Sequence, residues 1–198
     1  MRLFIAVNTD DKAKQLIHAV QDRIRKEAKQ GKYPPAENFH ITLVFLGEIQ
    51  QNRIPEIKQA IIHTFSDNGK PHPAFNLVFS KAGFFKRGNK ELWWLGMDPE
   101  KTDPAAELLK NLQKKLTSQL LNRKFSIDSR PFTPHITLGR EITGSLWPFA
   151  AENIIIPVNR ISLMQSLHVP AFPGKNKLVY TELFGYNLTR NESSAKIC

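Results

Sequence analysis

The sequence of 198 residues contains a single cysteine, Cys198, at its last position. One cysteine can form neither an internal disulfide nor a zinc-binding cysteine cluster, which excludes a secreted disulfide scaffold and favours a reducing compartment. Long apolar runs are also lacking, and the apolar run at residues 3–7 is far shorter than the core of a secretory signal or a membrane span. We therefore expect a cytoplasmic protein that does not span a membrane.

No low-complexity segment and no linker divides the chain. Hydrophobic residues make up 41% of the sequence, which is enough to bury a core without disulfides or metals. The length fits one domain or two small lobes. We expect a single bilobal catalytic domain over residues 1–198, with a polar tail from about residue 189.

The charge is strongly unbalanced, with 28 Lys and Arg against 18 Asp and Glu, a formal net charge of +10. A positive field attracts phosphates and releases counterions on binding, so nucleic acid leads the possible partners. Solubility alone explains a basic composition equally well. Charge therefore does not identify the partner by itself.

Hydrophobic periodicity predicts helices that alternate irregularly with strands. Helices are expected after a cap at Thr9 or Asp10 until Gly31, from about Pro55, and over about 104–121. Strands are expected at 2–8, 39–46, 75–80, 91–97, 135–140, 154–158, 161–169 and 178–187. This order predicts an α+β fold with largely antiparallel sheets.

The tetrapeptide His-Ile-Thr-Leu occurs twice, at residues 40–43 and 135–138, 95 residues apart. If each copy is a strand, its His and Thr share one face and its Ile and Leu share the other. Each copy then contributes half of a site and half of a core. The spacing, close to half the chain, indicates two related halves.

The chemistry of the repeat suits cleavage of a phosphate ester. An imidazole is a proton carrier near pH 7 and a hydroxyl is a neutral hydrogen-bond donor. One strand histidine is more often structural than catalytic, but two in identical settings favour an acid and base pair. A metal site is the weaker interpretation because no third ligand of obvious spacing is present. We expect no metal.

These motifs and their flanks resemble the 2H phosphoesterase superfamily, and within it the bacterial and archaeal RNA 2′,3′-cyclic phosphodiesterases, also known as 2′-5′ RNA ligases. The resemblance is carried by residues 2–7, 37–48, 92–96 and 130–140. It implies a bilobal, pseudo-symmetric α+β fold in which two antiparallel sheets line a central cleft with helices outside.

The resemblance also implies the activity: hydrolysis of an RNA 2′,3′-cyclic phosphate to a 2′-phosphate without metal or cofactor, with ATP-independent 2′-5′ ligation as a further reaction. By resemblance, His40 is the general acid and His135 the general base. Thr42 and Thr137 donate hydrogen bonds to phosphate oxygens, and Arg140 contacts the phosphate.

Phe45 matches a position where similar proteins place an aromatic ring against the terminal base, although core packing is the interpretation that the sequence alone favours. The basic connector 86–90 between Phe84-Phe85 and Trp93-Trp94 fits a nucleic-acid platform or a solvated hairpin tip equally well. Structural or surface roles are expected for the remaining candidates, His18, His63, His72, His168 and Cys198.

Two other functions stay open at this point. One is a non-catalytic protein that binds RNA or a nucleotide in the same cleft. The other is a related phosphodiesterase that acts on small cyclic nucleotides, ADP-ribose products or 2′-5′ oligonucleotides. A monomer without an obligate protein partner is expected, because neither a heptad pattern nor a long exposed apolar edge is evident.

Overall fold

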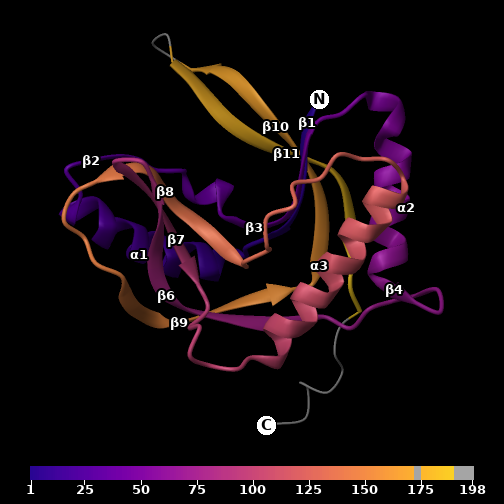
Figure 1. The fold of residues 1–198 in the computed structure, drawn as a ribbon, viewed down its shortest axis with the longest axis horizontal. Helices are drawn as coiled ribbons and strands as arrows, with labels where there is room; N and C mark the ends of the chain where they lie inside the picture. The colour runs from indigo at the N-terminus through magenta and orange to yellow at the C-terminus, as the bar shows by residue number, and fades with distance from the viewer. Residues whose placement is uncertain (172–174, 190–198) are drawn as a thin grey trace.

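The computed structural model describes residues 1–171 and 175–189, which form two lobes side by side (Figure 1). The helices are α1 (Asp11–Glu27), α2 (Ile54–Thr64) and α3 (Pro104–Asn122), with short 3₁₀ turns η1 (Ala36–Asn38) and η2 (Gln51–Arg53). The strands are β1 (Arg2–Asn8), β2 (Gln30–Lys32), β3 (His40–Glu48), β4 (Ser66–Asp67), β5 (Lys70–Pro71), β6 (Phe75–Arg87), β7 (Lys90–Gly96), β8 (His135–Thr143), β9 (Phe149–Val158), β10 (Arg160–Ala171) and β11 (Lys175–Asn187).

The strands pair antiparallel in the order β11-β10-β1-β3-β8-β7-β6-β9, and β2 adds to β8. The middle of this path is its weakest point, because β3 and β8 are joined by one residue pair, Ile41 and Ile136. The expected antiparallel α+β fold is confirmed. The two expected sheets are the halves on either side of this junction, each carrying one copy of the repeat.

The helices cover the outer faces of the two halves (Figure 1). Helix α1 begins at the Asp10 cap, whose carboxylate accepts a hydrogen bond from the Ala13 amide at 2.8 Å. Although it follows β1, it packs against β8 and β9 of the other half. Helices α2 and α3 pack on each other, with α2 against β11 and α3 against β3 and β6. The two halves are therefore interlocked.

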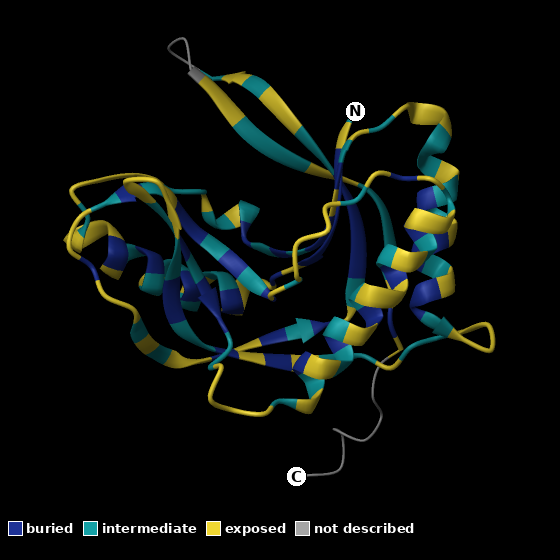
Figure 2. Cartoon of the chain, viewed as in Figure 1, coloured by how far each residue is buried: buried dark blue, intermediate teal, exposed yellow. Residues whose placement is uncertain are grey.

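The apolar faces of the sheets and helices form one main core (Figure 2). Ile41 and Ile136 lie in it together with Ile17 of α1 and Leu116 of α3, and all four are fully buried. A second, small cluster of Phe4, Ala6 and Met164 lies apart from it, packed with Tyr180. That cluster lies beneath one of the motif histidines, as described below.

Several boundaries and elements differ from the expected ones; β9, for example, begins at Phe149 instead of about 154. Helix α1 ends at Glu27, before Gly31, because the Lys29 amide bonds to the Thr143 carbonyl and the chain enters the unexpected strand β2. Strand β6 continues to Arg87 because β7 and β9 complete its hydrogen bonds, and the hairpin turns at Gly88 as the connector predicted. The short β4 and β5 hairpin was not expected. The polar tail lies almost wholly outside the described residues.

Within residues 1–171 and 175–189, no helix is both long and apolar enough to cross a membrane.

Candidate active site

The two motif strands meet where Ile41 pairs with Ile136. Paired residues of antiparallel strands point to the same face, and both isoleucines point into the core. Their neighbours along each strand therefore share the opposite face. The residues brought together there are His40, Thr42, His135 and Thr137, as the repeat predicted.

Both ring nitrogens of His40 are engaged. Nδ1 lies 2.7 Å from the Asn38 carbonyl oxygen, and Nε2 lies 2.9 Å from Thr42 Oγ1. A carbonyl can only accept, so Nδ1 carries the proton and Nε2 of the neutral ring accepts from the Thr42 hydroxyl. The rings of Phe4 and Tyr180 pack against the imidazole, with centroids 4.9 and 5.2 Å away. Nε2 is thus the unprotonated nitrogen, and its contact is a side-chain hydroxyl and not a backbone carbonyl.

His135 repeats the Nδ1 contact of His40. Its Nδ1 lies 2.7 Å from the carbonyl oxygen of Thr133, which precedes it by two residues, just as Asn38 precedes His40 by two. The Phe85 ring meets it edge-on with centroids 5.5 Å apart. Each histidine is therefore fixed in the same tautomer, with the proton on Nδ1, which is bonded to the carbonyl two residues earlier, and an unprotonated Nε2.

The pKa of each motif histidine is lowered. Burial lowers the pKa of His40 from 6.5 to about 4, and its hydrogen bond to Asn38 opposes the shift while the charges of Arg140 and His135 add to it. Burial likewise lowers the pKa of His135, opposed by Thr133 and aided by Arg140. Both imidazoles are therefore neutral near pH 7 in the free protein.

Phe45 and Arg140 each lie five residues after a motif histidine, and strict alternation would turn both away from the site. A β-bulge corrects this in each strand. In β3, consecutive residues of β1 pair with Thr42 and Val44, so one residue of β3 is extra. In β8, consecutive residues of β7 pair with Thr137 and Gly139. Both side chains consequently lie on the face of the histidines and are exposed.

The expectation of core packing for Phe45 was wrong. Its side chain is 45% exposed, and the guanidinium carbon of Arg2 lies 5.2 Å from the ring centroid. The ring helps to line a pocket of about 260 Å³ that also includes His40, Thr42 and Arg140. Sequence reasoning missed the pocket's other lining residues, which are Arg2, Phe4, Ser166, His168, Leu178 and Tyr180.

Comparison with known proteins agrees with this geometry. The model of the 2′-5′ RNA ligase superfamily matches residues 8–165. The chain belongs to this superfamily. It is 29% identical over 180 residues to a Thermotoga maritima protein named RNA 2′,3′-cyclic phosphodiesterase, covering 87% of this chain and 90% of the relative. It is 31% identical over 157 residues to the Escherichia coli protein of the same name, covering 79% and 76%.

A solved structure is similar to this chain over nearly its whole length. The crystal structure of Escherichia coli LigT complexed with 3′-AMP superposes with a TM-score of 0.77 at 27% sequence identity. The match covers 95% of this chain and 98% of that one. The expected family and fold are both confirmed.

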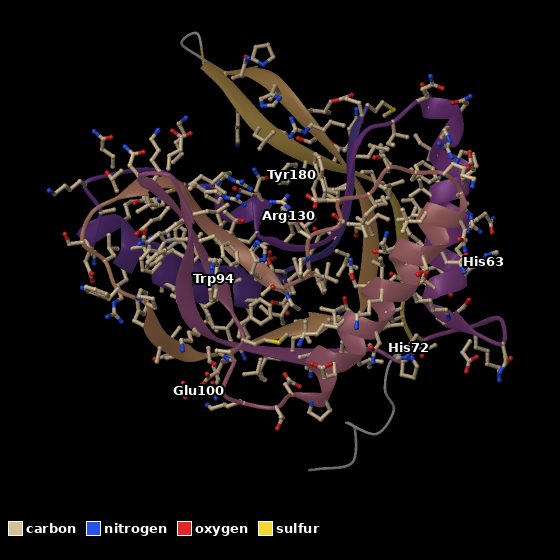
Figure 3. The ribbon with its side chains drawn as sticks, in the orientation of Figure 1. His63, His72, Trp94, Glu100, Arg130 and Tyr180 are labelled. Atoms are coloured by element: carbon tan, nitrogen blue, oxygen red, sulfur yellow. The ribbon has the colours of Figure 1, made fainter. Side chains whose placement is uncertain are left out.

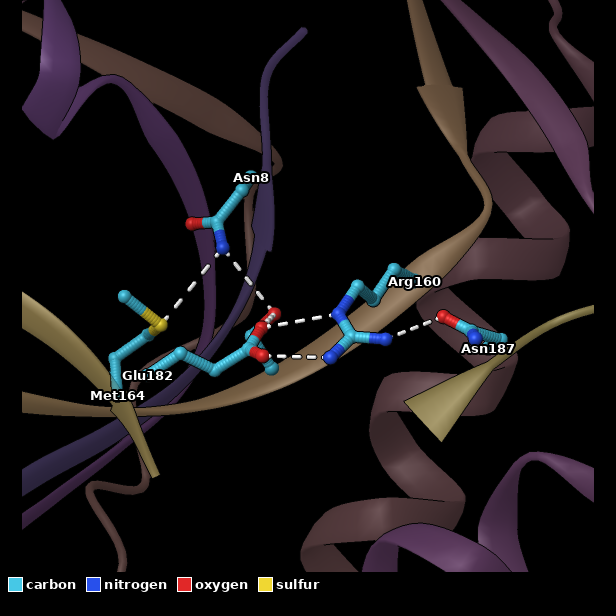
Figure 4. A network of polar contacts seen from close by, with 6 residues as sticks. Asn8, Arg160, Met164, Glu182 and Asn187 are labelled. Carbon is cyan, nitrogen blue, oxygen red and sulfur yellow. Dashed lines mark hydrogen bonds and ion pairs between the residues drawn. The ribbon is translucent and has the colours of Figure 1, made fainter. Parts of the chain in front are cut away.

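A polar network joins the strands next to the motif histidine His40 (Figure 4). Glu182 of β11 accepts from Arg160 of β10 at 2.6 and 3.1 Å, and from Ser162 Oγ at 2.5 Å. Asn8 of β1 donates to Ser162 Oγ at 3.2 Å, and Arg160 also donates to Asn187. Three strands are thereby tied together. The network fixes the register of β11, the strand that carries Tyr180 into the space between the lobes (Figure 3).

The aromatic residues around the basic connector separate by face. Trp93 is fully buried and packs against Phe84, with ring centroids 5.3 Å apart. Trp94 pairs with Thr137 and so shares the face of the motif histidines, where its ring lies 5.5 Å from that of Phe85. The connector itself is the exposed tip of the β6 and β7 hairpin.

The remaining candidate histidines do not join the motif pair. His18 lies 3.1 Å from Asp22 on α1. His63 and His72 lie at the outer edge of the molecule (Figure 3). His168 is exposed in the Phe45 pocket, a position that its own sequence context did not predict. Cys198 lies outside the described residues, within which no group of three or more His, Cys, Asp or Glu could hold a metal ion.

Proposed function

We propose that this chain hydrolyses the 2′,3′-cyclic phosphate at an RNA end to a 2′-phosphomonoester by acid and base catalysis, without a metal. The observation that carries the proposal is the equivalence of the two histidines, whose Nδ1 atoms are each tied to a carbonyl at 2.7 Å. Each ring thereby has an unprotonated Nε2, that of His40 meeting the Thr42 hydroxyl at 2.9 Å, and the two Nε2 atoms can exchange protons with one ligand. The names of the superfamily relatives support RNA as the substrate.

Each site residue has a role in this reaction. A water molecule attacks phosphorus, and His135 Nε2 takes a proton from this water. The bond from phosphorus to the 3′ oxygen breaks as His40 Nε2 delivers a proton to that oxygen. The sum is one water added across one ester bond. Hydrogen bonds from Thr42 and Thr137 and the charge of Arg140 stabilise the negative charge on the non-bridging oxygens.

His40 must be protonated to act as the acid, whereas its pKa of about 4 keeps it neutral in the free protein. A bound phosphate supplies the missing counter-charge, because an anion within a few ångströms raises the pKa of an imidazole. The acid therefore forms with the substrate in place. Thr42 Oγ1 lies 2.9 Å from Nε2, so a phosphate that accepts a hydrogen bond from Thr42 also lies close to Nε2.

The proposal also covers the catalytic unit, the base contact, the ligation reaction and the oligomeric state. Residues 1–198 act as one bilobal catalytic unit, because each lobe supplies one histidine and one threonine. Phe45, exposed in the pocket beside His40, contacts the terminal base. ATP-independent 2′-5′ ligation is the same chemistry with a ribose 5′ hydroxyl in place of water. The protein works as a monomer without an obligate partner. It works in the cytoplasm, since its lack of internal cysteine suits a reducing compartment.

The test is incubation of the EDTA-treated protein with a short RNA that ends in a 2′,3′-cyclic phosphate, with the 2′- and 3′-phosphate products resolved. Wild type should yield the 2′-phosphate, and His40→Ala and His135→Ala should each lose turnover. His63→Ala, a histidine at the outer edge, is the matched control and should behave like wild type. A 3′-phosphate product or active His→Ala variants would contradict the mechanism, and tight binding without turnover would identify a binding protein.

A further inference from the structure

A second pocket opens on the other side of the motif residues. It has a volume of about 360 Å³ and lies between β2 and η1 on one side and β11 on the other. It shares His40 and Arg140 with the Phe45 pocket, and it also reaches Thr137. Its size is within the range of small-ligand sites. A phosphate held at the shared residues would therefore have a pocket on each side.

The walls of this second pocket are fixed before any ligand arrives. Gln21 of α1 is fully buried, and its Nε2 donates to the carbonyls of Pro34 and Leu138, each at 2.9 Å. Asn38 Nδ2 donates to the Leu178 carbonyl of β11 at 3.0 Å, which joins the two walls. A buried side chain that uses two hydrogen bonds to position a loop makes a rigid wall. Rigid walls lower the entropy cost of binding.

The lining combines flat apolar surface with positive charge. Lys32, Tyr33, Pro34 and Pro35 line one wall, and Lys32 is ion-paired with Glu141. Arg25, outside this lining and ion-paired with Asp22, has its guanidinium carbon 4.7 Å from the centroid of the Tyr33 ring. Lys177 lines the other wall, is exposed, and forms no ion pair within residues 1–171 and 175–189. An aromatic ring beside a cation that can meet the backbone, here Tyr33 and Lys177, is the usual combination for a nucleotide.

We infer that this pocket is a second nucleoside subsite, so that the cleft binds the last two nucleosides of an RNA strand: the terminal nucleoside, which carries the reacting phosphate at His40 and Arg140, lies in the Phe45 pocket, and the nucleoside before it lies in the second pocket. The inference rests on the proposed function for the position of the reacting phosphate. Tyr33 stacks on the second base, and Lys177 meets the phosphate that links the two nucleosides. The preferred ligand is consequently a dinucleotide or longer strand rather than a mononucleotide.

Binding tests this independently of turnover. The two probes are adenosine 2′-phosphate and the dinucleotide ApA that ends in a 2′-phosphate, and dissociation constants are measured by calorimetry. Wild type should bind the dinucleotide at least about tenfold more tightly, the usual scale of one stacked base. The kcat/KM ratio for the matching 2′,3′-cyclic phosphates should show the same preference. Equal affinity for both probes would overturn the inference.

Two variants assign the preference to this pocket. Tyr33→Ala removes the stacking ring, and Lys177→Ala removes an exposed cation with little risk to the fold; each should reduce the dinucleotide preference about fivefold or more. Lys12→Ala, an exposed lysine of α1, is the matched control and should keep it. A preference unchanged in Lys177→Ala and in folded Tyr33→Ala would overturn the assignment. Dinucleotide preference in binding without turnover of either cyclic phosphate would instead overturn the proposed function and leave the subsite standing.

Discussion

Phe45 and Arg140 occupy equivalent positions in the two halves of the molecule. Each lies five residues after its motif histidine, and each is turned into the cleft by a β-bulge after the motif threonine. The two halves share a backbone device but not the side chain that it presents. One half offers an aromatic ring and the other a guanidinium, which fits the proposed contacts of Phe45 with a base and of Arg140 with a phosphate.

Replacing Arg140 by Gln should change both the rate and the pH dependence. The charge of Arg140 lowers the pKa of His40 and of His135, so its removal should raise both pKa values. Loss of one group that stabilises transition-state charge should also lower kcat about 100-fold or more. Histidine ring NMR titration and steady-state kinetics measure the two effects. Arg23→Gln, on the exposed face of α1, is the control, and unchanged histidine titrations in Arg140→Gln would contradict the argument.

Replacing Phe45 by Ala should weaken substrate binding with little loss of stability. The ring is 45% exposed, so its removal opens no core cavity, whereas loss of one stacked base should raise KM about tenfold. KM, kcat and the melting temperature are measured together. Trp147→Ala removes a ring that is 81% exposed and lines none of the three pockets that include His40, and it should leave KM unchanged. A large drop in melting temperature for Phe45→Ala would show that the ring stabilises the fold, contrary to this prediction.

The pH profile of kcat/KM should be bell-shaped with its maximum below about pH 6.5. In the proposed mechanism the reactive form has one proton on the pair, on His40, and the pKa values of both histidines are lowered from 6.5 in the free protein. That form is lost to deprotonation as pH rises and to double protonation as pH falls, with apparent pKa values that belong to the pair. The profile of kcat should lie at higher pH, because bound phosphate raises both values. A kcat/KM maximum above about pH 7.5 would be incompatible with this account.

The local parts of the site could be predicted from the sequence because they depend on neighbouring residues. The alternation of His40 and Thr42 against Ile41 needs only a strand, and the Asp10 cap needs only the helix that follows it. The junction of the two motif strands followed from the repeat. Family and fold followed from the same residues and their flanks.

The rest of the site depends on pairing between distant strands. Nothing near Phe45 in the sequence shows the bulge that turns it to the cleft, because the bulge exists only against β1. Tyr180 reaches His40 only because β11 is placed by β10 and the Glu182 network. Strand β6 runs past Ser80 because two neighbouring strands complete its ladder. Such contacts override the local pattern.

The burial of His40 should make the protein less stable in acid. Its pKa is about 4 in the folded state and about 6.5 in the unfolded chain, so the unfolded chain binds the proton first as pH falls. Above pH 6.5 both states are neutral and this residue adds no pH dependence. Between pH 6.5 and 4 the free energy of unfolding should fall by up to about 3 kcal/mol on its account, and below pH 4 its contribution should stay constant.

Chemical denaturation of wild type and His40→Gln at several pH values isolates this effect, because glutamine does not titrate. His135 also has a lowered pKa and destabilises both proteins in the same direction, so the difference between the two curves belongs to His40. That difference should grow as pH falls from 6.5 to 4, with wild type losing more. His63→Gln, at the outer edge, should follow the wild-type curve. Parallel curves for wild type and His40→Gln would show that the His40 imidazole is solvated in the folded protein and that its pKa is not lowered. Protonation of His40 would then not need a bound phosphate, contrary to the proposal.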